Sequence, residues 1–201
     1  AWDEAKARAG FIDFDDQIKP FSERLLPTSR ENINSGIKFV QNCEADGGTD
    51  INSALLEGLK NLNPEDKTSY IVFLTDGLPT VGLTDIKRIL ENVKGKNISN
   101  RIFVFGVGFD VNTHFLDRLA QENHATSDYV TPDEDIEVKV SNFFKKISNP
   151  ILSDLSLKFP GIKTFEIYPK ELPDLFSGSQ ILILGKYEGE GSSSATLSGY
   201  S

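Results

Sequence analysis

Two short loops carry the oxygen donors of this sequence that could bind a metal ion. The first loop, residues 45–50 (ADGGTD), runs directly into a helical pattern, and the second, residues 74–79 (LTDGLP), ends an apolar run. They supply the hydroxyl of Thr49 and the carboxylate of Asp76. Mg²⁺ and Ca²⁺ prefer hard oxygen ligands of this kind. The two loops therefore predict a cation site, provided that the fold brings them together.

Each loop also has a simple structural interpretation. Two glycines before a helix can form a tight turn in which Asp50 is the N-cap, and an Asp-Gly pair is a common turn after a strand. Both loops occur here in this order, with a helical pattern between them. That combination is more specific for a metal site than either loop alone.

The other residues that could do chemistry indicate no enzyme. Asp13, Asp15 and Asp16 are an alternative cation cluster, although a solvated strand end is the simpler interpretation. His114 and His124 are expected on the surface, and neither lies near an apparent nucleophile. Because no Ser/His/Asp, Cys/His or paired-acid constellation is apparent, we expect no catalytic residues.

Composition excludes several classes of protein. The net charge of −9 and the pI near 4.8 argue against a nucleic-acid partner, because phosphate binding requires clustered Lys and Arg. The single cysteine, Cys43, excludes an intrachain disulfide and is expected to be a small apolar residue near a helix end rather than a reactive thiol. The pair Gly106-x-Gly108 is only half of a dinucleotide fingerprint. No apolar run approaches the length of roughly 18 residues that a membrane span requires.

Apolar periodicity predicts strands that alternate with helices. Strands are expected at 11–14, 70–74, 102–107 and 129–130, with an edge strand or loop at 17–27. Helices are expected at 1–10, from an N-cap at Ser29 to Val40, at 50–62, at 86–95 with Gly95 closing the helix, at 115–120 and at 136–147. The run at 70–74 (YIVFL) is apolar throughout, which is typical of a strand covered on both faces.

This alternation predicts an α/β fold, a Rossmann-like, mostly parallel sheet with helices on both faces. Ligands of such sheets bind beyond the carboxyl ends of the strands, where Thr49 and Asp76 fall. The pattern changes at Asn149-Pro150, so we expect one domain at 1–149 and a β segment at 150–201. A segment of about 50 residues rarely has a stable core of its own and should pack on something else. Its Gly/Ser-rich end, 189–201, is expected to be loose.

These motifs resemble those of the von Willebrand factor type A domain, and more narrowly those of inter-alpha-trypsin inhibitor heavy chains and their bacterial relatives. The resemblance covers nearly the whole chain from Phe11. It is carried by FIDFD (11–15), ADGGTDIN (45–52), IVFLTDGLPT (71–80), VFGVG (104–108) and YPKELPDLFSGSQ (168–180).

The resemblance implies a metal-ion-dependent adhesion site on three loops. Thr49 would be the hydroxyl ligand of the second loop, and Asp76 the carboxylate of the third, often acting through water. The ion would be Mg²⁺, with Ca²⁺ or Mn²⁺ as alternatives, and an Asp or Glu carboxylate of a protein partner would complete its coordination.

The sequence departs from this family in its first part. It contains no Asp-x-Ser-x-Ser loop, and it lacks the first strand, which in the family lies between the strands expected at 11–14 and 70–74. Its absence leaves a gap of roughly 9.6 Å, two strand spacings, which no backbone hydrogen bond crosses. The missing strand could come from residues absent from this sequence near Gly10-Phe11, from another copy, or from an unusual role of residues 1–10.

The sequence therefore predicts a non-enzymatic protein-binding or adhesion module, extracytoplasmic, on a secreted or cell-surface protein. One alternative is a metal-independent structural interaction domain whose β segment docks on an N-terminal β domain, as the resemblance suggests. A second alternative, a hydrolase that uses Asp76, lacks any supporting constellation.

Overall fold

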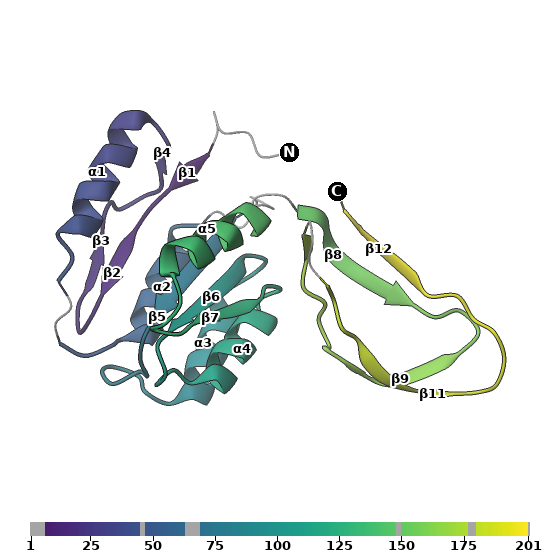
Figure 1. Cartoon of the computed structure of the whole chain (residues 1–201). Coiled ribbons are helices and arrows are strands. Elements are labelled where there is room, and N and C mark those ends of the chain that lie inside the picture. Colours follow the sequence, from purple (N-terminus) through teal and green to yellow (C-terminus); the bar gives the residue numbers. More distant parts are fainter. Residues whose placement is uncertain (1–6, 45–46, 63–68, 148–149, 177–179, 201) are drawn as a thin grey trace.

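The computed structural model describes residues 7–44, 47–62, 69–147, 150–176 and 180–200 (Figure 1). Its helices are α1 (Arg30–Gln41), α2 (Ile51–Lys60), α3 (Ile86–Lys96), α4 (Thr113–Gln121) and α5 (Ile136–Ile147). The strands of the α/β part are β1 (Arg8–Ala9), β2 (Ile12–Phe14), β3 (Ile18–Pro20), β4 (Leu26–Pro27), β5 (Tyr70–Thr75), β6 (Arg101–Val107) and β7 (Ser127–Val130). The β segment contains β8 (Pro150–Lys158), β9 (Lys163–Tyr168), β10 (Leu175–Phe176), β11 (Leu184–Glu188) and β12 (Thr196–Tyr200).

A three-stranded parallel sheet, in the order β5-β6-β7, is the centre of the α/β part. Thr75 at the end of β5 is level with Gly106, and Val107 at the end of β6 is level with Val130. The connecting loops therefore leave the sheet at one edge, the carboxyl-terminal edge. This architecture confirms the predicted α/β fold.

Side chains of β6 alternate between two buried clusters, as the period of a strand requires. Ile102 and Val104 pack in the larger cluster with α2, α3 and α4, while Phe103 and Phe105 pack in the smaller one with α5. The ring of Phe143 from α5 lies 4.4 Å from that of Phe105, centroid to centroid. The sheet thus has helices on both faces, as Figure 1 shows.

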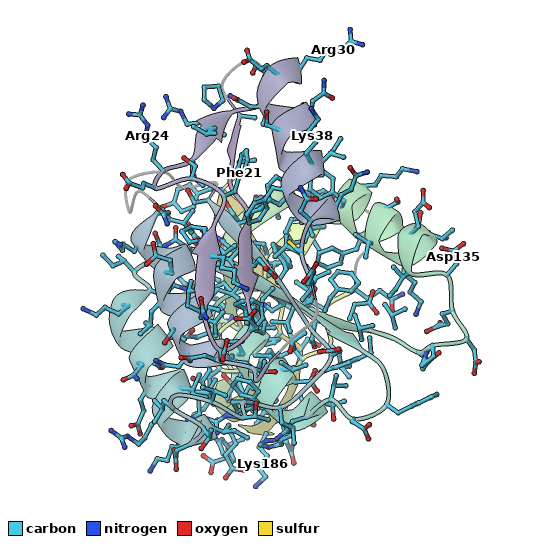
Figure 2. All side chains as sticks on the ribbon, turned by 90° about the vertical axis from the view of Figure 1, so that its left-hand side faces the viewer. Phe21, Arg24, Arg30, Lys38, Asp135 and Lys186 are labelled. Atoms are coloured by element: carbon cyan, nitrogen blue, oxygen red, sulfur yellow. The ribbon has the colours of Figure 1, made fainter. Side chains whose placement is uncertain are left out.

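The N-terminal elements form a small layer beside this sheet. Strands β2 and β3 pair as an antiparallel hairpin, which fits the edge strand expected at 17–27. Ser29 caps α1 as predicted, accepting a hydrogen bond from the backbone N–H of Asn32. Phe21 contacts Phe39 of α1, with ring centroids 5.4 Å apart. Figure 2 shows α1 beside the hairpin, with Phe21 between the two.

Among the described residues, β2 pairs only with β3, and β5 pairs only with β6 and not with β2. The two sheets meet through side chains instead. The rings of Phe14 and Phe73 stack at 5.4 Å, and Gly58 of α2 lies under Ile71. Between the sheets lies a cavity of about 220 Å³. The cavity lies where the resemblance predicts an absent strand.

The opening beside β5 also corrects one prediction. Val72 and Leu74 point to the face that α5 only partly covers, and they are 36% and 45% exposed. Phe73, on the opposite face, is buried. The expectation that residues 70–74 are covered on both faces is therefore wrong for one face, because no described strand or helix lies over the end of β5 there.

The β segment joins the α/β part near the end of α5. Strand β8 lies between β10 and β12, and β9 pairs with β11. Phe176 of β10 is 2% exposed and inserts beside Phe103, with ring centroids 5.6 Å apart. The β segment is therefore partly built into the smaller core of the α/β part.

Three local predictions differ from the structure. A helix was expected at 1–10, but residues 8–9 form β1, and residues 1–6 lie outside the described residues. Helix α3 continues through Gly95 to Lys96, and Asn97 caps it. The Gly/Ser-rich end is not loose throughout, because β12 pairs with β8 over residues 196–200. In each case a long-range contact or a cap outweighs local composition.

Candidate functional site

Hydrogen bonds join Thr49 of the first loop to the residues that directly follow the second loop. The N–H of Thr49 donates to the side-chain hydroxyl of Thr80 over 2.8 Å. The carbonyl of Thr49 accepts from the N–H of Thr80 over 3.1 Å and from that of Val81 over 3.4 Å. These bonds fix the first loop against the chain that follows the second loop, at the carboxyl-terminal edge of the sheet.

Asp50, next to Thr49, has a structural task. Its carboxylate caps α2, accepting from the backbone N–H of Ser53 over 3.0 Å and from the hydroxyl of Ser53 over 2.8 Å. Gly82 packs on the same carboxylate, with a φ of +65° and no room for a β-carbon. The simple interpretation of this position, an N-cap, is therefore confirmed.

Thr49 and Asp76 lie on adjoining loops. A β-carbon placed on Gly77 would be 3.9 Å from the hydroxyl oxygen of Thr49, so this hydroxyl lies beside the residue that follows Asp76. Thr49 is half-buried and Asp76 is exposed. The buried Thr75 accepts a hydrogen bond from the N–H of Gly77 over 3.4 Å, which shapes the turn. The hydroxyl-bearing and carboxylate-bearing loops are thus together, and their role as metal ligands stays a prediction.

The donors at this edge fit a divalent cation in kind but not in number. A hydroxyl and a carboxylate are suitable for Mg²⁺, which takes six oxygen ligands. Within the described ranges, no group of three or more His, Cys, Asp or Glu side chains is placed to hold a metal ion. Thr49 and Asp76 therefore need further ligands from a third loop, from water or from a partner.

In the acidic cluster at the end of β2, Asp15 is hydrogen-bonded within the protein. Asp15 accepts from the ammonium of Lys19 over 2.6 Å and from the N–H of Gln17 over 2.6 Å. These bonds lower the pKa of Asp15, with the Lys19 hydrogen bond as the largest cause. A buried, paired Asp15 favours the structural interpretation of Asp13, Asp15 and Asp16 over a cation cluster.

The remaining singled-out residues lie apart from this edge or serve packing. His114 is exposed on α4, and His124 lies 3.6 Å from Glu171, with both side chains partly exposed. Cys43 is exposed just past the end of α1. Gly106 permits close packing, since a β-carbon there would be 2.6 Å from the ring of Tyr129.

A buried ion pair between the α/β part and the β segment was not predicted. Arg101 opens β6, and its Nε donates to Asp174 over 2.8 Å, while its Nη2 donates to Asp154 over 2.8 Å. The side chains of Arg101 and Asp174 are 4% and 2% exposed. Burial is the largest single effect and disfavours the charged guanidinium, but the hydrogen bond to Asp174 and the charges of Asp174 and Asp154 together outweigh it, so the pKa of Arg101 is raised. The available signal was a lone Arg at the head of an apolar strand.

Comparison with known proteins assigns the family. No family model matches the chain. Over 200 residues it is 33% identical to human inter-alpha-trypsin inhibitor heavy chain H4, and over 198 residues 29% identical to human heavy chain H2. These alignments cover 94% and 92% of this chain. A solved structure of a von Willebrand factor type A protein from Catenulispora acidiphila superposes with a TM-score of 0.65 at 16% identity, over 95% of this chain and 47% of that one.

The sequence matches and the shared fold together support a von Willebrand factor type A domain like those of inter-alpha-trypsin inhibitor heavy chains. The chain spans only 21% of the length of either heavy chain, so the activities of those whole proteins are not transferred to it. Von Willebrand A domains of this kind are protein-interaction modules, which agrees with the predicted class of function. Across the described part of the chain, no helix has the length and apolar character of a membrane span.

Proposed function

We propose that the carboxyl-terminal edge of this von Willebrand A domain is a metal-assisted site for a protein partner. Thr49 and Asp76 would hold a divalent cation, Mg²⁺ or alternatively Ca²⁺ or Mn²⁺. A bound cation would supply an electrophilic position for an Asp or Glu carboxylate of the partner. The observation that carries this proposal is the pair of loops tied together by Thr49 and Thr80.

The cavity between β2 and β5 supports the way in which this site would be completed. It is lined by residues of both strands and of α2, and it borders the edge of β5 that faces away from β6. A strand placed there would end at the same edge as β5 if it ran parallel to it. The loop after it, the expected Asp-x-Ser-x-Ser, would then supply the ligands that the described residues lack.

The β segment supports a second contact. Strands β11 and β12 are exposed along their whole length, and Tyr187 and Tyr200 are each 68% exposed. Aromatic residues are enriched at protein–protein interfaces. We propose that it packs on a further β domain, expected on the N-terminal side, in an extracytoplasmic protein.

Calorimetric titration of the full-length protein with MgCl₂ and MnCl₂ tests the metal proposal. The wild type should release or absorb heat with saturation, and Thr49→Val and Asp76→Asn should each abolish that signal. Thr84→Val is the matched control, because Thr84 is exposed on the same edge and is not a proposed ligand. A wild-type protein that binds neither ion, with its first strand and loop present, would refute the proposal.

A second candidate function is a metal-independent interaction domain. It is favoured by the shortage of metal donors among the described residues. The two functions differ in a binding assay, since equal partner affinity with and without a chelator supports the metal-independent form. We propose no enzymatic activity. Any hydrolase activity that survived Asp76→Ala would exclude Asp76 as its catalytic residue.

A further inference from the structure

The carboxyl-terminal edge combines exposed apolar side chains with exposed acidic ones. Leu78, just beyond β5, is 45% exposed, and Phe109, just beyond β6, is 72% exposed. Thr75 and Gly106 are partners in the parallel register, and each apolar residue follows its strand partner by the same number of positions. Leu78 and Phe109 therefore project from neighbouring loops, about one strand spacing apart at their base, ~4.8 Å.

The loops around this apolar pair carry negative charge. Residues 76–85, 108–112 and 131–135 contain no Lys, Arg or His. Some acidic side chains of these loops already interact within the protein: Asp85 caps α3, and Glu134 forms an ion pair with Lys139 over 2.8 Å. Glu134 accepts from Lys139 and from Thr131, which lowers its pKa to about 2, so it stays ionised in all ordinary conditions.

Asp76, Asp110 and Asp133 are exposed, and no ion pair of theirs is found in the part of the chain that the structure describes. Asp135 is also exposed, but its carboxylate accepts a hydrogen bond from the backbone N–H of Val138.

At the opposite edge, α2, α3 and α4 carry Lys60, Lys94 and Arg118 in their last turns, where Lys60 pairs with Glu57 and Arg118 pairs with Glu122. The loops of the carboxyl-terminal edge, in contrast, carry acids and no basic residue. This acidic edge attracts cationic surfaces and repels anionic ones, over distances of about 10 Å at ordinary salt.

We propose that this edge binds a partner segment that carries Lys or Arg side chains next to an apolar one. Phe109 and Leu78 contact the apolar side chain, while Asp76, Asp110 and Asp133 face the basic ones. The inference rests on the proposed function only in using the same edge, and it does not require a metal ion. It adds a selection rule, because a partner carboxylate alone would approach a surface of its own charge.

The test uses the chain in chelating buffer and an array of synthetic peptides of equal length. All peptides contain the same two Leu residues, and their other positions vary from Glu-rich through Ser-rich to Lys- and Arg-rich. Binding should rise with positive charge and weaken as salt is added, and Phe109→Ser should weaken the best peptide by roughly tenfold or more. Asp110→Asn with Asp133→Asn should flatten the dependence on peptide charge.

Matched controls separate this edge from general stickiness. Ile98→Ser removes an apolar side chain that is 75% exposed at the opposite edge of the sheet, and Glu91→Gln removes an exposed acid of α3. Both variants should leave peptide binding unchanged. Equal binding of Glu-rich and Lys-rich peptides would overturn the inference, as would full binding by Phe109→Ser. Because the chelator removes any ion, failure here is separate from failure of the Mg²⁺ titration.

Discussion

Removal of Asp174 should destabilise the chain strongly, because it leaves a buried guanidinium without its main counter-ion. Arg101 keeps its hydrogen bonds to the carbonyl of Ser99 over 2.9 Å and to Asp154 over 2.8 Å. It loses its bonds of 2.8 and 3.3 Å to Asp174, and the N–H of Asp154 loses its 3.1 Å acceptor. Breaking a buried pair from one side costs about 3–5 kcal/mol.

We expect Asp174→Ala to fall at the lower end of that range, about 3 kcal/mol, since Asp154 remains beside Arg101. In a chain of this size the loss corresponds to a fall in Tm of roughly 6–12 °C. Urea denaturation followed by circular dichroism measures the free energy of unfolding. Glu171→Ala is the control, because its contact with His124 is partly exposed and worth about 0–1 kcal/mol.

A double variant distinguishes an ion pair from two independent packing sites. Arg101→Met removes the charge while keeping apolar bulk, so Arg101→Met with Asp174→Leu should cost less than the sum of the two single changes. The reasoning would be refuted if Asp174→Ala cost no more than Glu171→Ala, or if the double variant were simply additive.

Three further predictions concern packing and pH. Phe143 is buried, so Phe143→Ala should lower the free energy of unfolding by about 3–5 kcal/mol in urea denaturation. The side chain of Phe144 is 57% exposed, so Phe144→Ser should change it by less than about 0.5 kcal/mol. Equal costs would place both rings in the core. Gly106→Ala should cost about 1–3 kcal/mol, because its new methyl group meets the ring of Tyr129; a neutral result would mean that this ring moves freely. The pKa of Glu134 is lowered from 4.5 to about 2, so its contribution to folding stability is complete above pH 4.5 and is lost as the pH falls through about 2. Glu134→Gln should therefore reduce the change of the urea midpoint with pH over this interval. An unchanged pH dependence would exclude a stabilising role for the Glu134 carboxylate.

Much of the fold follows from local sequence signals. Caps at Ser29 and Asp50 mark helix starts because their side chains satisfy backbone N–H groups, and the structure confirms both. The continuous apolar run of β6 reflects a strand buried on both faces. Such signals depend on neighbours along the chain, which is why they can be read without coordinates.

Contacts between distant segments were harder to foresee. The pairing of β12 with β8 joins a Gly/Ser-rich end to an apolar strand, and nothing local to residues 196–200 indicates it. The adjacent rings Phe143 and Phe144 look alike in sequence, yet one is buried and the other exposed. At the candidate site, the hydrogen bond from the N–H of Thr49 to the hydroxyl of Thr80 was not predicted, because Thr80 follows the loop at 74–79 and its side chain was assigned no role.

The attachment of the β2–β3 hairpin and α1 has a dynamic consequence. This layer touches the rest of the α/β part through side chains such as Phe14, through contacts with α2 and through the bond from the N–H of Asp50 to the carbonyl of Asp15. Because no strand ladder among the described residues joins the layer to β5, we expect the layer to open as a unit before the rest of the domain unfolds. Its amide protons should exchange with solvent well before those of β6, because the layer would separate from the sheet while the sheet stays folded.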